Sequence, residues 1–122
     1  MYPDIDSALL ADTLIDITTV GRKTGQPRRI EIWFHYIDGR IYITGSPGPR
    51  GWYANMLANP DLTFHLKQSI RKDILGRATA ITEPNDKRRV FQRMHEVEER
   101  MRGTTLEDRV SHAPLVEIEL TG

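Results

Sequence analysis

Alternating apolar and polar positions predict that most of this chain forms short β-strands. The clearest alternation runs from Arg28 to Ile37, where isoleucine, isoleucine, phenylalanine and tyrosine fill positions 30, 32, 34 and 36. The residues expected on the opposite face of this strand are Glu31, Trp33, His35 and Ile37. Asp38-Gly39 follows and predicts a type I′ hairpin turn, because such a turn needs a positive φ at both central positions. The other expected strands cover residues 14–20, 40–45, 62–67, 70–82 and 115–120, which makes six in total.

Three segments predict helices around these strands. They are Pro3–Ala11, Trp52–Ala58 and a longer one from Pro84 to about Met101. The longest carries one apolar stripe at helical spacing, and its charged face is expected to be solvated; the stripe consists of Val90, Phe91, Met94, Val97 and Met101. Residues 103–114 are expected to form a loop. Because the strands follow one another in hairpins, the pattern favours a mainly β (α+β), six-stranded antiparallel barrel with peripheral helices over a doubly wound sheet.

Composition narrows the possible functions. A chain of 122 residues predicts one domain, residues 1–122. Lys plus Arg and Asp plus Glu each number 17, so no overall field attracts nucleic acid or a membrane. The absence of cysteine excludes disulfides, a thiol nucleophile and a thiolate metal site. No apolar run approaches about 20 residues and the first ten residues do not resemble a signal peptide, so we expect a cytoplasmic protein.

The turn between the first two expected strands is strongly basic. Arg22, Lys23, Arg28 and Arg29 lie within eight residues, and glycines at positions 21 and 25 allow the backbone to turn tightly. The cations and the Thr24 hydroxyl are groups that bind phosphate well. The alternative is an ordinary solvated hairpin turn. The segment lacks the P-loop pattern, and without an aromatic platform it is thin evidence for nucleic-acid binding.

A second unusual segment precedes the short central helix. Residues 46–51 read Ser-Pro-Gly-Pro-Arg-Gly, and Arg50 adds a positive charge where the helix N-terminus already attracts anions. Trp52 and Tyr53 follow and offer flat apolar surface, while Asn55 shares the Trp52 side of the helix. These residues suit a ligand that is both aromatic and phosphorylated. The alternative is simple packing on the barrel, which we prefer for residues 56 and 57 and leave open for Arg50, Trp52 and Asn55.

Three motifs together resemble the deazaflavin-dependent nitroreductase and quinone reductase family. They are Gly-Arg-Lys-Thr-Gly-Gln-Pro-Arg at 21–28, Ser-Pro-Gly at 46–48 and Trp-Tyr-Ala-Asn-Met-Leu-Ala-Asn-Pro at 52–60, and the resemblance covers residues 15–67. It implies a split β-barrel of the FMN-binding type and the deazaflavin coenzyme F-420 as cofactor. It also implies hydride transfer from the reduced cofactor to a quinone, nitro compound or similar small electrophile. FMN, FAD or haem are the alternative cofactors.

The resemblance also implies roles for individual residues. Arg22, Lys23 and Arg28 match positions that grip the cofactor's phosphate and acidic tail, with Thr24 in the same turn. Ser46 and Gly48 match the loop around the central part of the cofactor. Trp52 and Asn55 match positions beside the ring system, and Arg50 lies just before them. The family resemblance further implies a homodimer. Many members carry proline at position 31, where this sequence has glutamate.

The chemistry itself would belong to the cofactor, so no catalytic triad is required. Tyr53, His35 and Glu31 are candidate proton donors or substrate-positioning groups. His35 could instead be an ordinary strand histidine that pairs with a cross-strand neighbour. The other three histidines lack metal-ligand spacing, so we predict no catalytic metal. The alternative function is a non-catalytic binder or carrier of a flavin, haem or lipid-like molecule in the same barrel cleft.

Overall fold

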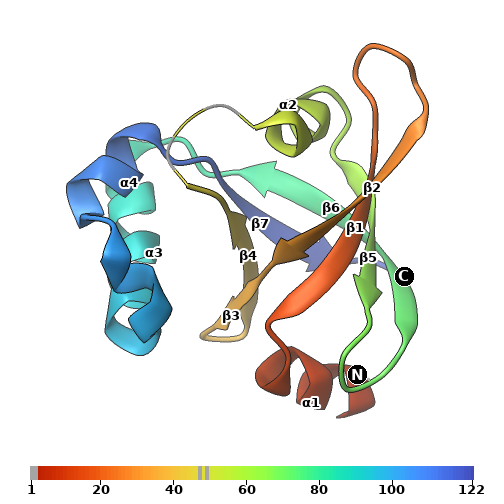
Figure 1. The fold of residues 1–122 in the computed structure, drawn as a ribbon, viewed down its shortest axis with the longest axis horizontal. Coiled ribbons are helices and arrows are strands. Elements are labelled where there is room, and N and C mark those ends of the chain that lie inside the picture. Colours follow the sequence, from red (N-terminus) through yellow and green to blue (C-terminus); the bar gives the residue numbers. More distant parts are fainter. Residues whose placement is uncertain (1–2, 47, 49) are drawn as a thin grey trace.

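Seven strands form one antiparallel sheet in the computed structural model, which describes residues 3–46, 48 and 50–122 (Figure 1). The strands are β1 (Leu14–Val20), β2 (Pro27–Trp33), β3 (His35–Ile37), β4 (Arg40–Thr44), β5 (Asp61–Leu66), β6 (Lys72–Ala80) and β7 (Leu115–Leu120). Their order in the sheet is β2-β1-β5-β6-β7-β4-β3. The two edge strands are consecutive in the chain, with only Phe34 between them. The sheet therefore curls until its edges approach each other, as the predicted split barrel requires.

The predicted strand from Arg28 to Ile37 is wrong in one respect, because Phe34 divides it. β2 pairs with β1, whereas β3 pairs with β4 at the other end of the sheet. The Phe34 N–H donates to the Thr13 carbonyl at 3.0 Å, and its ring packs edge-on against Phe64 at 5.6 Å. This corner changes which side chains are buried: His35 is buried, whereas Glu31 and Trp33 are exposed. The expected common face of these three residues is therefore also wrong, and the strands number seven instead of six.

Helices cover the ends and one side of the barrel (Figure 1). They are α1 (Pro3–Ala11), α2 (Gly51–Ala58), α3 (Pro84–Val97), the 3-10 helix η1 (Glu99–Gly103) and α4 (Leu106–His112). In Figure 1, α1 lies at one end of the barrel, α2 at the other, and α3 and α4 form a layer beside β3 and β4. No described helix is both long and apolar enough to cross a membrane.

The C-terminal helices differ from the prediction at two points. α3 ends at Val97 instead of near residue 101, because the backbone of Glu98 leaves the helix with φ −127° and ψ 106°. The expected loop at 103–114 contains α4, whose start is capped by the Thr105 hydroxyl accepting from the Asp108 N–H at 3.2 Å. Thr-x-x-Asp is a helix-start signal, so the sequence did contain the information.

The core has two parts that follow this arrangement. The larger part fills the barrel and includes Ile15, Ile17, Phe64 and Met56. The smaller part lies between the barrel and the α3–α4 layer, and its buried members are Ile37, Tyr42, Phe91, Met94, Met101, Val110, Ala113 and Leu115. Full burial of one such large apolar side chain contributes about 1.5–3 kcal/mol. Three residues of the predicted apolar stripe are thus buried, whereas Val97 at the helix end is 47% exposed.

The predicted hairpin turn between β3 and β4 is confirmed. Asp38 has φ 54° and Gly39 has φ 76°, so both central positions adopt the left-handed conformation of a type I′ turn. The turn returns the chain directly into β4. It thereby places Thr44 and Ser46 next to the start of the loop that leads to α2.

Candidate functional site

The basic turn between β1 and β2 is held in a defined shape by its own hydrogen bonds. The Gly21 N–H donates to the Gln26 carbonyl at 2.8 Å, and the Gly25 N–H donates to the Gly21 carbonyl at 2.8 Å. A Cβ at position 21 would lie 2.8 Å from the Thr24 hydroxyl and 3.2 Å from the Gln26 carbonyl, so only glycine fits there without a shift. Gly25 has φ 71°, which also favours glycine. The turn is therefore a fixed support for the cations it carries.

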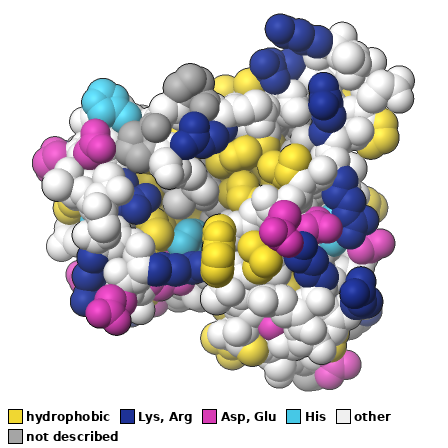
Figure 2. Space-filling model, in the orientation of Figure 1, with side chains coloured by type: hydrophobic (Ala, Val, Ile, Leu, Met, Phe, Trp, Pro, Cys, Tyr) yellow, Lys and Arg dark blue, Asp and Glu magenta, His cyan; other side chains and the backbone are white. Residues whose placement is uncertain are grey.

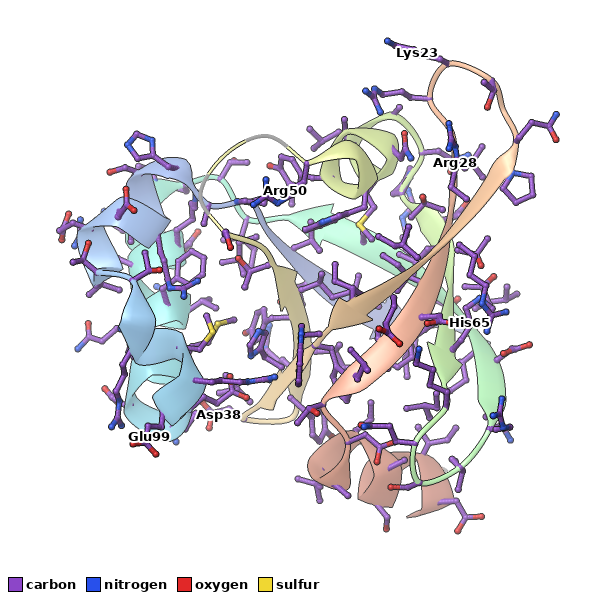
Figure 3. The ribbon with its side chains drawn as sticks, viewed as in Figure 1. Lys23, Arg28, Asp38, Arg50, His65 and Glu99 are labelled. Atoms are coloured by element: carbon purple, nitrogen blue, oxygen red, sulfur yellow. The ribbon has the colours of Figure 1, made fainter. Side chains whose placement is uncertain are left out.

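This turn and the start of α2 enclose a cleft of about 380 Å³. Its lining residues are Thr19, Gly21, Arg22, Lys23, Thr24, Arg28, Ile30, Gly51, Trp52 and Asn55. Figure 2 shows Lys and Arg side chains gathered over the turn, beside a hollow floored by apolar side chains. Figure 3 shows Lys23 and Arg28 on the hairpin, with Arg50 on the opposite side of α2 in this view. The structure thus brings together the two segments that the sequence analysis singled out.

Asn55 connects the turn to α2. Its side-chain oxygen accepts from the backbone N–H of Arg22 at 3.1 Å and from the Arg22 guanidinium at 3.0 Å. Its amide nitrogen donates to the Thr19 hydroxyl at 3.4 Å. Asn55 is buried, and all its polar atoms have partners within the protein. Its side chain therefore orients Arg22, and this role could not be predicted from the sequence.

The charges in the cleft are not neutralised by acidic groups. No carboxylate lines it, and the side chains of Lys23 and Arg28 make neither an ion pair nor a hydrogen bond with the part of the chain that the structure describes. Gly51, the first residue of α2, lines the same cleft, and none of the described side chains caps this helix end. A helix N-terminus carries a partial positive charge and unpaired N–H groups. The cleft is therefore built to receive an anion, while Trp52 and Ile30 supply apolar wall.

The remaining predicted residues lie outside this cleft. Gly48, Arg50 and Tyr53 line a wider depression of about 720 Å³ between α2 and α4. The Gly48 N–H donates to the His112 carbonyl at 3.1 Å, which ties this loop to the end of α4. Pro47 and Pro49 of the same loop lie outside the described residues. Ser46 and His35 line a separate pocket, under the end of β4.

Glu31 lies on the outer surface of the sheet and lines none of these cavities. It forms an ion pair with Lys67, which also binds Asp16 at 2.6 Å. The hydrogen bond from Lys67, followed by that from Arg29, keeps the pKa of Asp16 below its ordinary value despite some burial. The carboxylate at position 31 therefore neutralises a lysine and does not enter the cleft.

His35 binds Glu98, the residue that ends α3, through its Nδ1 atom. His35 does lie opposite Tyr42 of β4 in the strand register, but its side chain binds Glu98 instead of this cross-strand neighbour. Burial pushes the pKa of Glu98 upward, but the hydrogen bond and charge of His35 and the charge of Arg100 outweigh it, so the pKa lies below its ordinary value. Arg100 also donates to the Phe34 carbonyl at 2.8 Å. The sequence pattern alone does not reveal Glu98 and Arg100, because both lie in a charged run that indicates a solvated helix face.

A second histidine, His65, links a hydroxyl to a carboxylate by hydrogen bonds across the sheet. Thr18 Oγ1 lies 2.7 Å from His65 Nε2, and His65 Nδ1 lies 2.7 Å from Asp73 Oδ1. The three residues come from β1, β5 and β6, and none of them lines a cavity described above. These hydrogen bonds therefore link the side chains of three adjacent strands.

Comparison with known proteins agrees with this architecture. Three solved structures of similar fold are a conserved hypothetical protein from Mycobacterium tuberculosis, an F420 reductase and a FAD-binding protein from Mesorhizobium loti. Their TM-scores are 0.74, 0.68 and 0.70, and their sequence identities are 20%, 18% and 15%. The alignments cover 100%, 96% and 96% of this chain and 82%, 93% and 87% of those chains. At these identities the structures establish the fold, which is the predicted split barrel.

The family follows from the sequence itself. Residues 7–108 match the model of the F420H(2)-dependent quinone reductase family, which is most of the chain. This match extends the predicted resemblance beyond residues 15–67, through α3 and into α4. The predictions of a reductase and of deazaflavin F-420 as cofactor are confirmed at the level of the family. The chain therefore belongs to the F420H(2)-dependent quinone reductase family.

Proposed function

We propose that this protein binds coenzyme F-420 in the basic cleft and reduces a quinone or a similar small electrophile. The observation that carries this proposal is the group of three cations, Arg22, Lys23 and Arg28, which face the start of α2 with no carboxylate among the cleft's lining residues. A cofactor with a phosphate and an acidic tail matches this charge. Its flat ring matches the apolar wall beside Trp52. The volume of about 380 Å³ falls in the usual range for small-molecule sites.

The cofactor, when bound in its reduced form, supplies the hydride. The protein's own residues bind and shield it. Lys23 and Arg28 would donate to the anionic oxygens of the cofactor, and Asn55 holds Arg22 at the same cleft. The buried Trp52 ring, which packs edge-on against Tyr53 at 5.9 Å, excludes water from one wall. Each charge-assisted hydrogen bond from Lys23 or Arg28 to the cofactor would contribute about 1.5–3 kcal/mol.

The acceptor side of the site is a separate part of the proposal. Among the three candidate proton donors, we favour His35, because it is buried and lines a pocket next to Ser46. Tyr53 lines the depression on the other side and stays a candidate. We give Glu31 no catalytic role, because its carboxylate is bound to Lys67 on the outer surface. A nitro compound is the alternative to a quinone as acceptor.

The proposal includes a homodimer in the cytoplasm. Large apolar side chains such as Leu57 and Val97 are exposed on the described surface, and contact with a second copy would remove them from water. Light scattering of the purified protein measures the assembly directly. A monomer at micromolar concentration would contradict the dimer.

The decisive experiment combines titration with turnover. The full chain is titrated with F-420, FMN, FAD and haem, and the reduced form of the bound cofactor is then mixed with a panel of quinones and nitro compounds. Selective binding of F-420 and oxidation of its reduced form by a quinone would support the proposal. Tight binding without turnover on any acceptor would instead support the carrier. Preferential binding of FMN, FAD or haem would overturn the cofactor assignment.

A further inference from the structure

The pocket lined by Ser46 and His35, called the second pocket from here on, lies on the side of the barrel that faces the α3–α4 layer. Its volume is about 360 Å³, and its lining residues are Trp33, His35, Thr44, Gly45, Ser46, Arg100, Met101 and Arg109. These come from β2, β3, the end of β4, η1 and α4, so the pocket joins the barrel to the helical layer. Ser46 is five positions before Gly51, which lines the basic cleft. The loop between them thus has one end at each pocket.

Arg109 is the unusual feature of this pocket. Its side chain is only 8% exposed, and its Nε atom has no hydrogen-bond partner. Its guanidinium makes no hydrogen bond or ion pair with the residues that the structure describes. Burial lowers the pKa of Arg109, and the nearby charge of Asp108 offsets this only in part. A buried guanidinium nitrogen without a hydrogen bond is costly, and folded proteins rarely leave such an atom without a partner.

The surroundings of Arg109 do not provide that partner. His95 lies close enough for its pKa to be lowered by burial and by the charges of Arg109 and Arg102. Its Nε2 atom is also buried without a hydrogen bond. Arg100, in contrast, has partners within the protein: its Nη2 atom donates to the Phe34 carbonyl at 2.8 Å and to the Glu98 carboxylate at 3.2 Å. The uncommitted positive charge in the pocket therefore belongs to Arg109.

The opposite wall is suited to a flat ring. The Trp33 side chain is 54% exposed, and the Arg100 guanidinium lies 5.1 Å from the centre of its ring. Met101, which is buried, adds apolar surface. Figure 2 shows a histidine and Lys and Arg side chains beside an apolar group in the middle of this face. Guanidinium groups bind carboxylates through two parallel hydrogen bonds, which is the best match to an unpaired arginine.

We propose that this pocket binds an aromatic carboxylate, with Arg109 holding the carboxylate and Trp33 contacting the ring. Identifying this ligand as the electron acceptor rests on the proposed function, and it makes the natural acceptor a quinone that carries a carboxylate. The binding itself does not depend on F-420. Arg109 is then a specificity-determining residue that selects acidic over neutral acceptors.

The test measures binding of 2-naphthoate and of its neutral analogue 2-naphthamide to the full chain by calorimetry. We expect the wild type to bind the carboxylate at least tenfold more tightly than the amide. Arg109→Met should remove this preference, whereas Arg109→Lys should keep part of it. Arg89→Met, which removes the same charge from an exposed ion pair on α3, should leave it unchanged. Equal affinity for the two probes in the wild type, or an unchanged preference in Arg109→Met, would overturn the proposal.

Two further variants separate this pocket from the basic cleft. Arg28→Ala should weaken F-420 binding and leave 2-naphthoate binding unchanged; loss of 2-naphthoate binding in Arg28→Ala would assign the probe to the basic cleft and overturn the proposal. Arg109→Met should stay folded by circular dichroism, since methionine removes the buried charge and keeps much of the volume. In turnover, Arg109→Met should raise KM for a naphthoquinone carboxylate and spare the neutral naphthoquinone. An equal loss with both acceptors would contradict the selection of acidic acceptors.

Discussion

Two neighbouring arginines on β2 have opposite surroundings. Arg28 faces the basic cleft and makes no ion pair with the described residues. Arg29 points to the other side of the sheet, where its Nε lies 3.0 Å from Asp16. Lys67 binds the same aspartate and also Glu31, so this outer cluster of Asp16, Arg29, Glu31 and Lys67 is neutral overall. Strand alternation alone separates the two arginines.

The difference shows how charge pairing distinguishes a binding surface from a structural one. An anion that approaches Arg28 replaces water. An anion that approaches Arg29 would have to displace a carboxylate already in place. In the sequence both residues belong to one basic run, and only the positions of the carboxylates tell them apart. Figure 3 shows Lys23 at the tip of the hairpin and Arg28 nearer its base, so that both charges lie on the same turn.

The largest expected effect follows from removing the unpaired charges. Lys23→Ala combined with Arg28→Ala should weaken F-420 binding by about 10²–10⁴-fold, because two charge-assisted hydrogen bonds are worth about 3–6 kcal/mol together. The measurement is a titration followed by cofactor fluorescence. Both residues are exposed, so the melting temperature should change little.

Arg29→Ala is the matched control for this double variant. It removes a positive charge from the adjacent position, but on the side of the outer cluster. Its affinity for F-420 should stay within about twofold of the wild type. A comparable loss in Arg29→Ala would mean that the whole basic run acts through its net charge, and the distinction between the two arginines would fail.

The second prediction places a carboxylate in the basic cleft, so that a cation there becomes paired, as the cations of the outer cluster already are. Asn55→Asp puts a carboxylate where the amide oxygen now accepts two hydrogen bonds from Arg22. The new charge should hold Arg22 more firmly and repel the cofactor's anionic groups, so that F-420 affinity falls by about tenfold or more. Asn55→Ala is the companion variant, since it removes the link without adding a charge. If Asn55→Asp bound F-420 as well as the wild type, Arg22 would have no part in binding it.

The third prediction uses salt to test whether the unpaired charges of the basic cleft attract F-420 in the unmodified protein. The screening length falls from about 10 Å at 0.1 M salt to about 3 Å at 1 M. Binding of F-420 to the basic cleft should therefore weaken several-fold over this range. The affinity for a neutral acceptor should be nearly constant over the same series, which serves as the internal reference. An F-420 affinity independent of salt would contradict an electrostatic role for the turn.

Local signals made much of the fold predictable. The Asp-Gly turn, the strand at 14–20 and the helix end at Ala58 each depend on residues close together in the chain, and all three occur where the sequence indicated. The break at Phe34 could not be read in this way, because the alternation continues through it. It arises where the two edges of the sheet meet, which is a property of the closed barrel. The start of α4 carried a capping signal, but its short apolar pattern was too weak to predict a helix.

The two pockets differ in the same way. The basic cleft is built mainly from two compact motifs, residues 21–28 and 51–55. Both motifs could be recognised in the sequence, and the structure shows that they lie side by side. The second pocket takes residues from five separate elements, and no motif surrounds Arg109. Its unpaired charge becomes visible only when every neighbour is in place. Sites assembled from single residues on many elements are therefore the ones that sequence patterns miss.

The smallest expected effect concerns the outer cluster and its dependence on pH. Asp16→Asn should cost about 1 kcal/mol of stability at pH 7, since it removes the shared partner of Lys67 and Arg29. The hydrogen bond from Lys67 is the main cause that lowers the pKa of Asp16 in the folded protein. A lowered folded-state pKa means that the contribution is complete above the ordinary value of 3.8 and is lost as the pH falls through the folded-state pKa. Thermal melts of wild type and Asp16→Asn should therefore differ at pH 7 and converge in acid. F-420 affinity at pH 7 should be the same in both, and a weakened affinity in Asp16→Asn would show that the outer cluster is not independent of the cleft.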